Sequence, residues 1–162
     1  MHGNLINTHI DMKKLFNYCL ALCLTTAIYS TADAQVRKIP SEVTEAFRQK
    51  YPTALNVEWH DHLTNFTADF DLDKVHYEAK FNNKGMWQNT ENKIDTAGIP
   101  APIKEGFQKS KYVEDWKIKN AYKIALREDK TQYRLEIQKN DIQKKQLYFD
   151  STGRLLRDNI TL

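Results

Sequence analysis

Residues 66–85 read F-T-A-D-F-D-L-D-K-V-H-Y-E-A-K-F-N-N-K-G, and this stretch decides the fold. Apolar and polar residues alternate on both sides of Asp73-Lys74, which is typical of two strands that each have one buried and one polar face. Leu72-Asp73-Lys74 suits the tip of a hairpin between them. Gly85 supplies the positive φ that the next turn requires. The stretch therefore predicts antiparallel strands that are covered on one side.

The elements around this stretch occur twice in the chain. An Ile-Pro pair with a phenylalanine downstream opens each copy, and an F-x-x-x-G turn comes near its end. Proline suits a first helical turn because its missing N–H is not needed there. The pattern predicts two repeat units, residues 39–90 and 99–160, each with one helix and four strands. The matching residues are Ile39-Pro40 and Ile99-Pro100, Phe47 and Phe107, and the turns Phe81–Gly85 and Phe149–Gly153. We therefore expect an α+β fold in which two tandem helix–β4 units form a two-layer body of helices on an antiparallel sheet.

The N-terminal segment, residues 1–34, has the parts of an export signal in the required order. Two lysines follow Met12, an apolar run covers residues 15–28, and the small-residue site Ala32-Asp33-Ala34 comes next. The apolar run is too short to span a bilayer. We expect translation to start at Met12 and cleavage to follow Ala34.

Residues 35–162 would then form a single domain in the periplasm or outside the cell. Neither Cys19 nor Cys23 follows a small residue, so we expect no lipid anchor. No later stretch is apolar and long enough to span a membrane. The cleaved chain would contain no cysteine and would depend on its hydrophobic core alone.

Charge and motifs argue against several classes of function. The net charge is −2 for residues 35–97 and +5 for residues 98–162, which is too mild for a nucleic-acid-binding protein. Residues 35–162 contain no G-x-S-x-G, H-E-x-x-H or Gly-rich phosphate loop, and no cysteine nucleophile. We therefore expect neither an enzyme nor a bound cofactor.

One helix followed by four strands, twice over and after an export signal, resembles the PepSY-like family of small exported bacterial proteins. The resemblance covers residues 36–162 and implies a β-lactamase-inhibitor-protein-like fold. It also implies a non-catalytic, inhibitor-like binding module that acts on a secreted or envelope enzyme through its exposed sheet face. The residues that carry it are Ile39-Pro40, Phe47, Tyr51-Pro52, Trp59, the Phe81–Gly85 turn with Trp87, Ile99-Pro100, Phe107, Phe149 and Gly153.

The second half of the chain has basic residues on its predicted strands. An exposed basic sheet face could meet an acidic protein, and an adjacent tyrosine could anchor the partner. We therefore expect this face to contact an unidentified protein partner. The residues are Lys117, Lys119, Lys123, Arg127, Arg134, Lys144 and Tyr148.

A metal site is the alternative hypothesis. Glu58, His60 and His62 are spaced by two residues on one predicted strand, so their side chains would point to the same face. Imidazole and carboxylate groups are ligands of zinc and copper. A periplasmic metal-binding protein therefore stays open, as does a structural component of a larger envelope complex.

Overall fold

The computed structural model describes residues 38–161 of the 162-residue chain. The predicted export segment, with its start at Met12 and its cleavage site after Ala34, lies outside these residues. No helix within residues 38–161 has the length and apolar character needed to cross a membrane.

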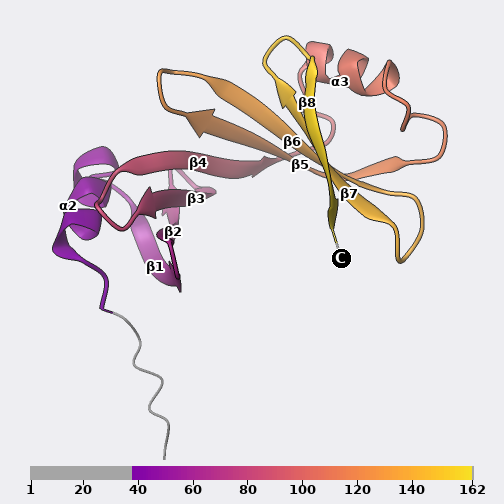
Figure 1. Cartoon of the computed structure of the whole chain (residues 1–162). Helices are drawn as coiled ribbons and strands as arrows, with labels where there is room; N and C mark the ends of the chain where they lie inside the picture. Colours follow the sequence, from indigo (N-terminus) through magenta and orange to yellow (C-terminus); the bar gives the residue numbers. More distant parts are fainter. Residues whose placement is uncertain (1–37, 162) are drawn as a thin grey trace, which may run out of the picture. The chain divides into compact units, whose positions relative to one another are not determined.

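The described chain consists of two short helices and eight strands (Figure 1). All neighbouring strands are antiparallel, and their order in the sheet follows their order in the sequence. The elements are α2 (Ser41–Lys50), β1 (Leu55–His62), β2 (Asn65–Leu72), β3 (Val75–Asn82), β4 (Trp87–Ile94), α3 (Ala101–Gln108), β5 (Lys117–Leu126), β6 (Thr131–Gln138), β7 (Lys144–Asp150) and β8 (Leu155–Thr161).

The predicted fold class, two tandem helix–β4 units in a two-layer body, was wrong. The protein is mainly one eight-stranded antiparallel sheet, and its helices are only 10 and 8 residues long. The sheet is continuous because β4 pairs with β5, from Asn89↔Leu126 to Ile94↔Ala121. The hydrogen-bonded ladder therefore runs through the point where the prediction placed a boundary between two units.

The first hydrophobic core lies between α2 and strands β1–β4. Val43 and Phe47 are four residues apart, so both lie on the buried face of α2. The Phe47 ring packs edge-on against Trp59 at 5.3 Å and Phe70 at 5.0 Å, measured between ring centroids. Phe81 from β3 is also fully buried here. This aromatic cluster fixes α2 on the sheet.

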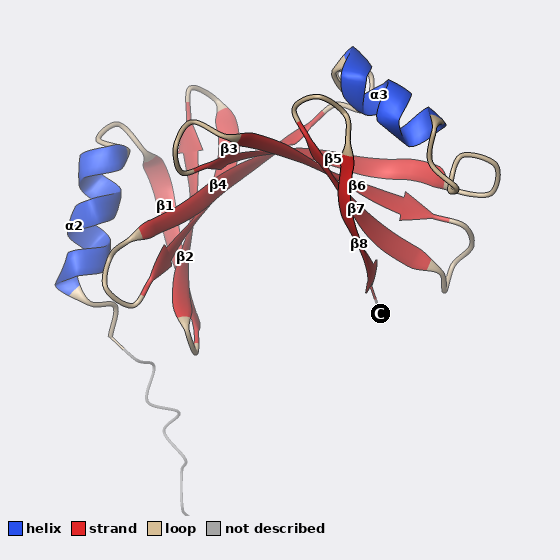
Figure 2. Cartoon of the chain, turned by 45° about the horizontal axis from the view of Figure 1, so that its top comes forward, coloured by secondary structure: helices blue, strands red, loops and turns tan. Residues whose placement is uncertain are grey.

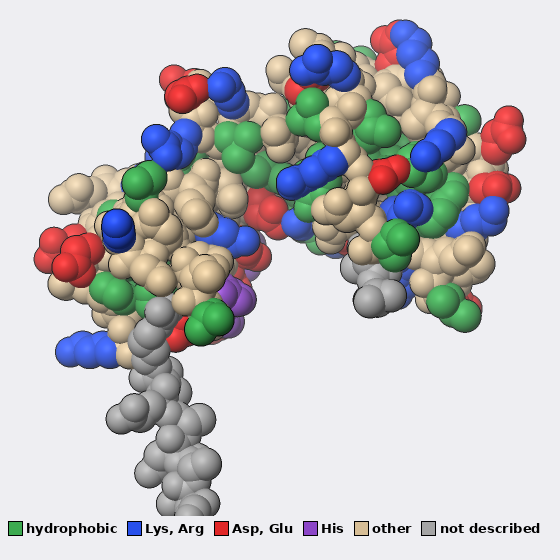
Figure 3. Space-filling view, viewed as in Figure 1, with side chains coloured by type: hydrophobic (Ala, Val, Ile, Leu, Met, Phe, Trp, Pro, Cys, Tyr) green, Lys and Arg blue, Asp and Glu red, His purple; other side chains and the backbone are tan. Residues whose placement is uncertain are grey.

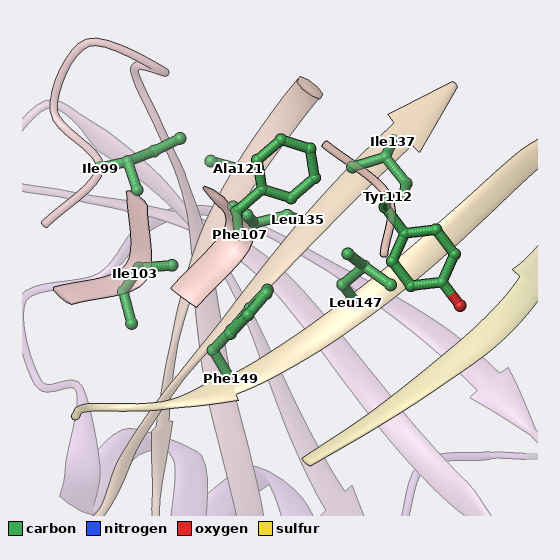
Figure 4. Packing of buried hydrophobic residues seen from close by; sticks show 9 residues of the cluster. All are labelled: Ile99, Ile103, Phe107, Tyr112, Ala121, Leu135, Ile137, Leu147 and Phe149. Atoms are coloured by element: carbon green, nitrogen blue, oxygen red, sulfur yellow. The ribbon is translucent and has the colours of Figure 1, made fainter. Parts of the chain in front are cut away.

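The second core lies between α3 and strands β5–β7. Ile103 and Phe107 are the buried residues of α3, and they pack on Leu135, Leu147 and Phe149. Figure 4 shows these side chains pointing toward one another across the helix–sheet interface. The two cores share no buried residue, so each helix is held by its own half of the sheet.

Both cores lie on the same face of the sheet. Residues paired directly across antiparallel strands point to the same face. Ala79 of the first core pairs with Thr90, and Thr90 pairs with Ala125. Ala125 shares its face of β5 with Ala121, which belongs to the second core. Both helices accordingly cover one side of the sheet (Figure 2), and the opposite side, which we call the open face, carries no helix.

A glycine joins each F-x-x-x-G turn to a helix. Gly85 and Gly153 have φ values of +76° and +87°, a conformation that favours glycine. A Cβ atom on Gly85 would lie 2.5 Å from the Glu42 carbonyl oxygen. A Cβ on Gly153 would clash with the Pro102 carbonyl, and one on Gly106 would clash with Gly153. In both turns the glycine therefore packs directly against the backbone of a helix.

Candidate functional site

The open face carries a row of alternating tyrosine and arginine side chains across the second half of the sheet. Tyr122 pairs with Arg134, Arg134 pairs with Tyr148, and Tyr148 pairs with Arg157. These four residues form what we call the Arg–Tyr row. The Arg134 guanidinium lies 4.2 Å from the centroid of the Tyr122 ring, and that of Arg157 lies 3.9 Å from the Tyr148 ring. Both distances are typical of cation–π contacts.

Arg134 is held in this row by an ion pair with a residue of β4, which lies on the other side of β5. Its Nη2 donates to Glu91 Oε1 at 2.6 Å, and the two side chains are only 16% and 14% exposed. Burial raises the pKa of Glu91 although the Arg134 charge acts to lower it. Burial also raises the pKa of Tyr122, and the Glu136 carboxylate adds to that rise. The Tyr122 hydroxyl therefore stays protonated at neutral pH.

A second row on the open face is acidic and crosses the first half of the sheet. Glu58 pairs with Asp69, Asp69 pairs with Glu78, and Glu78 pairs with Glu91. We call these four residues the acidic row. The His60 ring lies beside it, with Nε2 3.1 Å from Asp69 Oδ2. Figure 3 shows histidine and acidic side chains next to one another on this half of the molecule.

The structure divides the predicted basic residues between several places. Four of them lie on the open face: Lys117, Arg134, Lys144 and Tyr148. Arg134 pairs with Tyr148, and Lys117 and Lys144 both pair with Gln138, which shares its face of β6 with Arg134. Lys119 lies at an irregularity in the β5–β6 register. It lines, with Glu136 and Lys144, an open-face hollow of about 260 Å³.

Lys123 and Arg127 lie away from that group. Lys123 pairs with Tyr133, whose side chain packs against the second core, so Lys123 points to the helix-bearing face. Arg127 follows the end of β5 and lies 3.1 Å from the sulfur of Met86. These two residues are therefore not part of the surface that contains the Arg–Tyr row.

The residues of the metal hypothesis share the open face but form no centre. Glu58, His60 and His62 pair with Asp69, Thr67 and Asn65. In the part of the chain that the structure describes, no three or more His, Cys, Asp or Glu side chains are placed to hold a metal ion. The geometry therefore gives the metal hypothesis no support.

Sequence reasoning did not identify Tyr122, Arg157 or, apart from Glu58, the members of the acidic row as parts of a site. Strand periodicity assigns each of these residues to a face. Whether they lie side by side in a row can be predicted only when the register of four strands is known. Tyr122 and Tyr148 both lie opposite an arginine, and this cross-strand pattern is the signal that a correct register would have provided.

Comparison with known proteins agrees with this architecture. Residues 62–157, more than half of the chain, match the family described as "Putative beta-lactamase-inhibitor-like, PepSY-like". A search of curated proteins found no match.

Several solved structures share the fold. A BLIP-like protein from Bacteroides fragilis has a TM-score of 0.69 at 21% identity, with 80% of this chain and 91% of that chain covered. A DUF2874 family protein from Bacteroides uniformis has a TM-score of 0.68 at 22% identity, with 75% and 88% covered. A protein from Bacteroides eggerthii, named among "putative periplasmic proteins", has a TM-score of 0.67 at 21% identity, with 76% and 90% covered. The family match, together with this shared fold, shows that the chain belongs to the PepSY-like, beta-lactamase-inhibitor-like family.

Proposed function

We propose that this protein is an exported, non-catalytic binding protein that acts in an inhibitor-like manner on an envelope or secreted enzyme. The contact is made by the open face, and the Arg–Tyr row is its centre. The observation that carries this proposal is the row itself, in which two arginines stack on two tyrosines across four neighbouring strands.

The composition of the row suits protein recognition. Tyrosine and arginine are enriched among the residues that contribute most to binding energy in protein interfaces. A side chain that is already stacked loses less conformational entropy on binding than a freely rotating one. Arg134 and Tyr148 are preorganised in this sense, while Arg157 is exposed and available to a partner.

Family membership and the solved relatives also support an exported, inhibitor-like binding protein. The family description contains the words beta-lactamase-inhibitor-like, and one structure of similar fold is named a BLIP-like protein. Another structure of similar fold is named among "putative periplasmic proteins", which agrees with the export signal expected in residues 1–34. The absence of the common catalytic motifs from residues 35–162 also fits a binding protein.

Reversing charge on the open face should strongly reduce partner capture. The tagged protein and an Arg157→Glu, Lys144→Glu variant are used to recover proteins from envelope extract. Lys144 and Arg157 are both exposed, so the substitutions leave the core intact. We expect the recovered amount of a stoichiometric partner to fall at least about tenfold, the loss expected for interface residues of large effect.

Lys123→Glu is the matched control, because Lys123 is an exposed basic strand residue on the helix-bearing face. Its capture should equal that of the unmodified protein. Equal recovery by all three proteins would refute the open face as the binding surface. An assay of the recovered enzyme with and without this protein then tests inhibition, and unchanged activity in a stoichiometric complex would indicate a structural role.

A further inference from the structure

The hollow of about 260 Å³ on the open face, which we call the lysine hollow, carries a surplus of positive charge. Its lining contains one carboxylate and three ammonium groups, those of Lys119, Lys144 and Lys145. The carboxylate of Glu136 is engaged with other groups, because Oε2 accepts from Asn120 Nδ2 at 2.8 Å and Oε1 lies 3.9 Å from Nη2 of Arg134. Among residues 38–161, neither Lys119 nor Lys144 forms an ion pair.

A β-bulge in β5 puts Lys119 at this hollow. Ile118 pairs with Ile137 and Asn120 pairs with Glu136, so Lys119 is an extra residue with no place in the β5–β6 ladder. A bulge re-aims the side chain of its extra residue, and bulges are frequent next to functional sites. Ile118 still packs against the second core, and Asn120 still bonds to Glu136. The bulge therefore adds a lysine to the hollow while the core below it stays intact.

Exposed isoleucines next to the hollow give a second, independent observation. Ile142 is 88% and Ile160 is 73% exposed, which makes them two of the three most exposed large apolar side chains in the described chain. Ile142 lies in the hairpin tip that follows the pair Gln138↔Lys144, and Ile160 pairs with Lys145. Apolar side chains that gather at one exposed place and are rimmed by polar residues mark protein interaction sites. This observation points to a polypeptide ligand and not to a small anion.

The hairpin tip that carries Ile142 is held in place by hydrogen bonds. Asn140 Oδ1 accepts from the backbone N–H groups of Ile142 and Gln143, at 3.1 and 2.8 Å. Lys139 Nζ donates to Asp115 Oδ2 at 2.6 Å, which ties the tip to the loop before β5. A preorganised segment loses less conformational entropy when it binds. The tip is therefore suited to present Ile142 to a partner.

A carboxylate side chain fits the lysine hollow. The volume of about 260 Å³ lies below the roughly 300–1,000 Å³ of pockets for larger ligands. Lys119 and Lys144 come from β5 and β7, and Gln138 of β6 contributes an amide between them. Ammonium groups form strong, charge-assisted hydrogen bonds with carboxylates. The lining therefore offers donors to both oxygens of an aspartate or glutamate side chain.

We propose that this end of the open face binds an acidic segment of the protein partner, with an aspartate or glutamate side chain in the lysine hollow and a neighbouring apolar side chain against Ile142. This inference rests on the proposed function and specifies the chemistry of that partner. The hollow and the Arg–Tyr row share the open face, because Glu136 follows Arg134 by two residues on β6. A partner that covers the row therefore reaches the hollow as well.

Two peptides test the proposal without knowledge of the partner. Hexaglutamate and the peptide E-E-L-E-E-L are added at low salt to the ¹⁵N-labelled protein, expressed with its own N-terminal segment, and K-K-L-K-K-L serves as the negative peptide. We expect chemical-shift changes centred on Lys119, Gln138 and Lys144. The affinity for both acidic peptides should be at least about fivefold weaker in a Lys119→Gln, Lys144→Gln variant, since two charge pairs are lost.

Two further variants separate the parts of the site. Lys84→Gln, Lys123→Gln is the matched control, because it removes the same charge from exposed positions outside the hollow. It should bind both acidic peptides as the unmodified protein does. Ile142→Ser should weaken the leucine-containing peptide by at least about threefold, through lost apolar burial, and leave hexaglutamate unaffected.

Several results would overturn the inference. Equal weakening by Lys84→Gln, Lys123→Gln would show diffuse attraction of anions, and shift changes elsewhere would place the site on another surface. Displacement of the peptides by phosphate at matched ionic strength would assign the hollow to a small anion. An unchanged affinity of Ile142→Ser for the leucine-containing peptide would refute the apolar contact.

Capture from envelope extract distinguishes this inference from the proposed function. Arg157 does not line the lysine hollow, so Arg157→Glu alone reports on the Arg–Tyr row and Lys119→Glu alone reports on the hollow. We expect both variants to recover less of the partner. Loss with Arg157→Glu but not with Lys119→Glu would leave the proposed function standing and remove only this inference. Loss with neither variant would refute the open face as the binding surface.

Thermal unfolding shows whether weak binding has a structural cause. Lys119, Lys144 and Ile142 are exposed, so the Tm of their variants should stay within about 2 °C of the unmodified protein. A variant that binds weakly at an unchanged Tm cannot owe its weak binding to misfolding. A larger fall in Tm would show that these side chains stabilise the sheet and would contradict the proposal that they serve a partner.

Discussion

Replacing Gly153 by alanine is expected to lower the free energy of unfolding by about 3 kcal/mol or more. The left-handed conformation of this residue alone costs an L-amino acid roughly 1–2 kcal/mol. The added Cβ would also strike the carbonyl of Pro102 in the first turn of α3, and that contact is with backbone, which cannot rotate away. Since a domain has only about 5–15 kcal/mol of stability in total, the variant should be close to unfolding. Urea denaturation followed by far-UV circular dichroism measures the change.

Gly98→Ala is the control for this experiment. A Cβ at Gly98 would come no nearer than 3.4 Å to the Asp95 carbonyl oxygen, an ordinary contact, so its effect should stay within about 0.5 kcal/mol. Gly106→Ala should be nearly as damaging as Gly153→Ala, because its Cβ would meet the same turn from the helix side. If Gly153→Ala unfolded at the same urea concentration as Gly98→Ala, the turn would not depend on close backbone contact.

The local part of the fold could be predicted from the sequence because it is encoded over short distances. Alternation in residues 66–85 predicted two strands with a tip at Leu72-Asp73-Lys74. In the structure β2 and β3 are paired up to Leu72↔Val75, and the two residues between them, Asp73 and Lys74, have positive φ. The continuous sheet could not be predicted in the same way. It depends on the pairing of β4 with β5, and β4 reads W-Q-N-T-E-N-K-I, which has too few apolar residues to specify a long-range register.

The candidate site shows the same division between local and long-range information. Grouping the basic residues of the second half by charge alone placed Lys123 with Arg134. In a strand, successive side chains point to opposite faces, and the structure puts Lys123 opposite Tyr133 on the helix-bearing side. The acidic row could not be predicted, because its four members come from four strands and meet only through three separate registers.

Stability and recognition compete on the open face. The helix-bearing face holds the two cores, whereas the open face holds the like-charged acidic row and the ion pair of Arg134 with Glu91. Taking ions out of water is costly, so a largely buried ion pair stabilises a fold less than apolar packing of the same volume would. Arg134 therefore serves mainly to orient the Arg–Tyr row, and its removal should be damaging chiefly because Glu91 is left behind.

Replacing Arg134 by methionine is expected to destabilise the protein by about 1–3 kcal/mol at pH 7. Breaking a fully buried pair costs about 3–5 kcal/mol, and the partial exposure of both side chains reduces this. The loss should be pH-dependent. Burial already raises the pKa of Glu91 above that of the unfolded chain, and without the Arg134 charge the pKa should rise further. The folded state then binds a proton more readily than the unfolded state, so the variant regains stability as the pH falls through the raised pKa of Glu91.

Urea unfolding of the unmodified protein and of Arg134→Met at pH 7 and pH 5 measures this difference. The stability deficit of Arg134→Met should be largest at pH 7 and clearly smaller at pH 5, since protonation removes the unpaired charge. The double variant Glu91→Gln, Arg134→Met leaves no unpaired carboxylate behind. It should therefore recover most of the stability that Arg134→Met loses at pH 7, and its stability deficit should no longer depend on pH. A deficit of equal size at both pH values, or no recovery in the double variant, would mean that Arg134 stabilises the sheet through its packing on Tyr122 and not through Glu91.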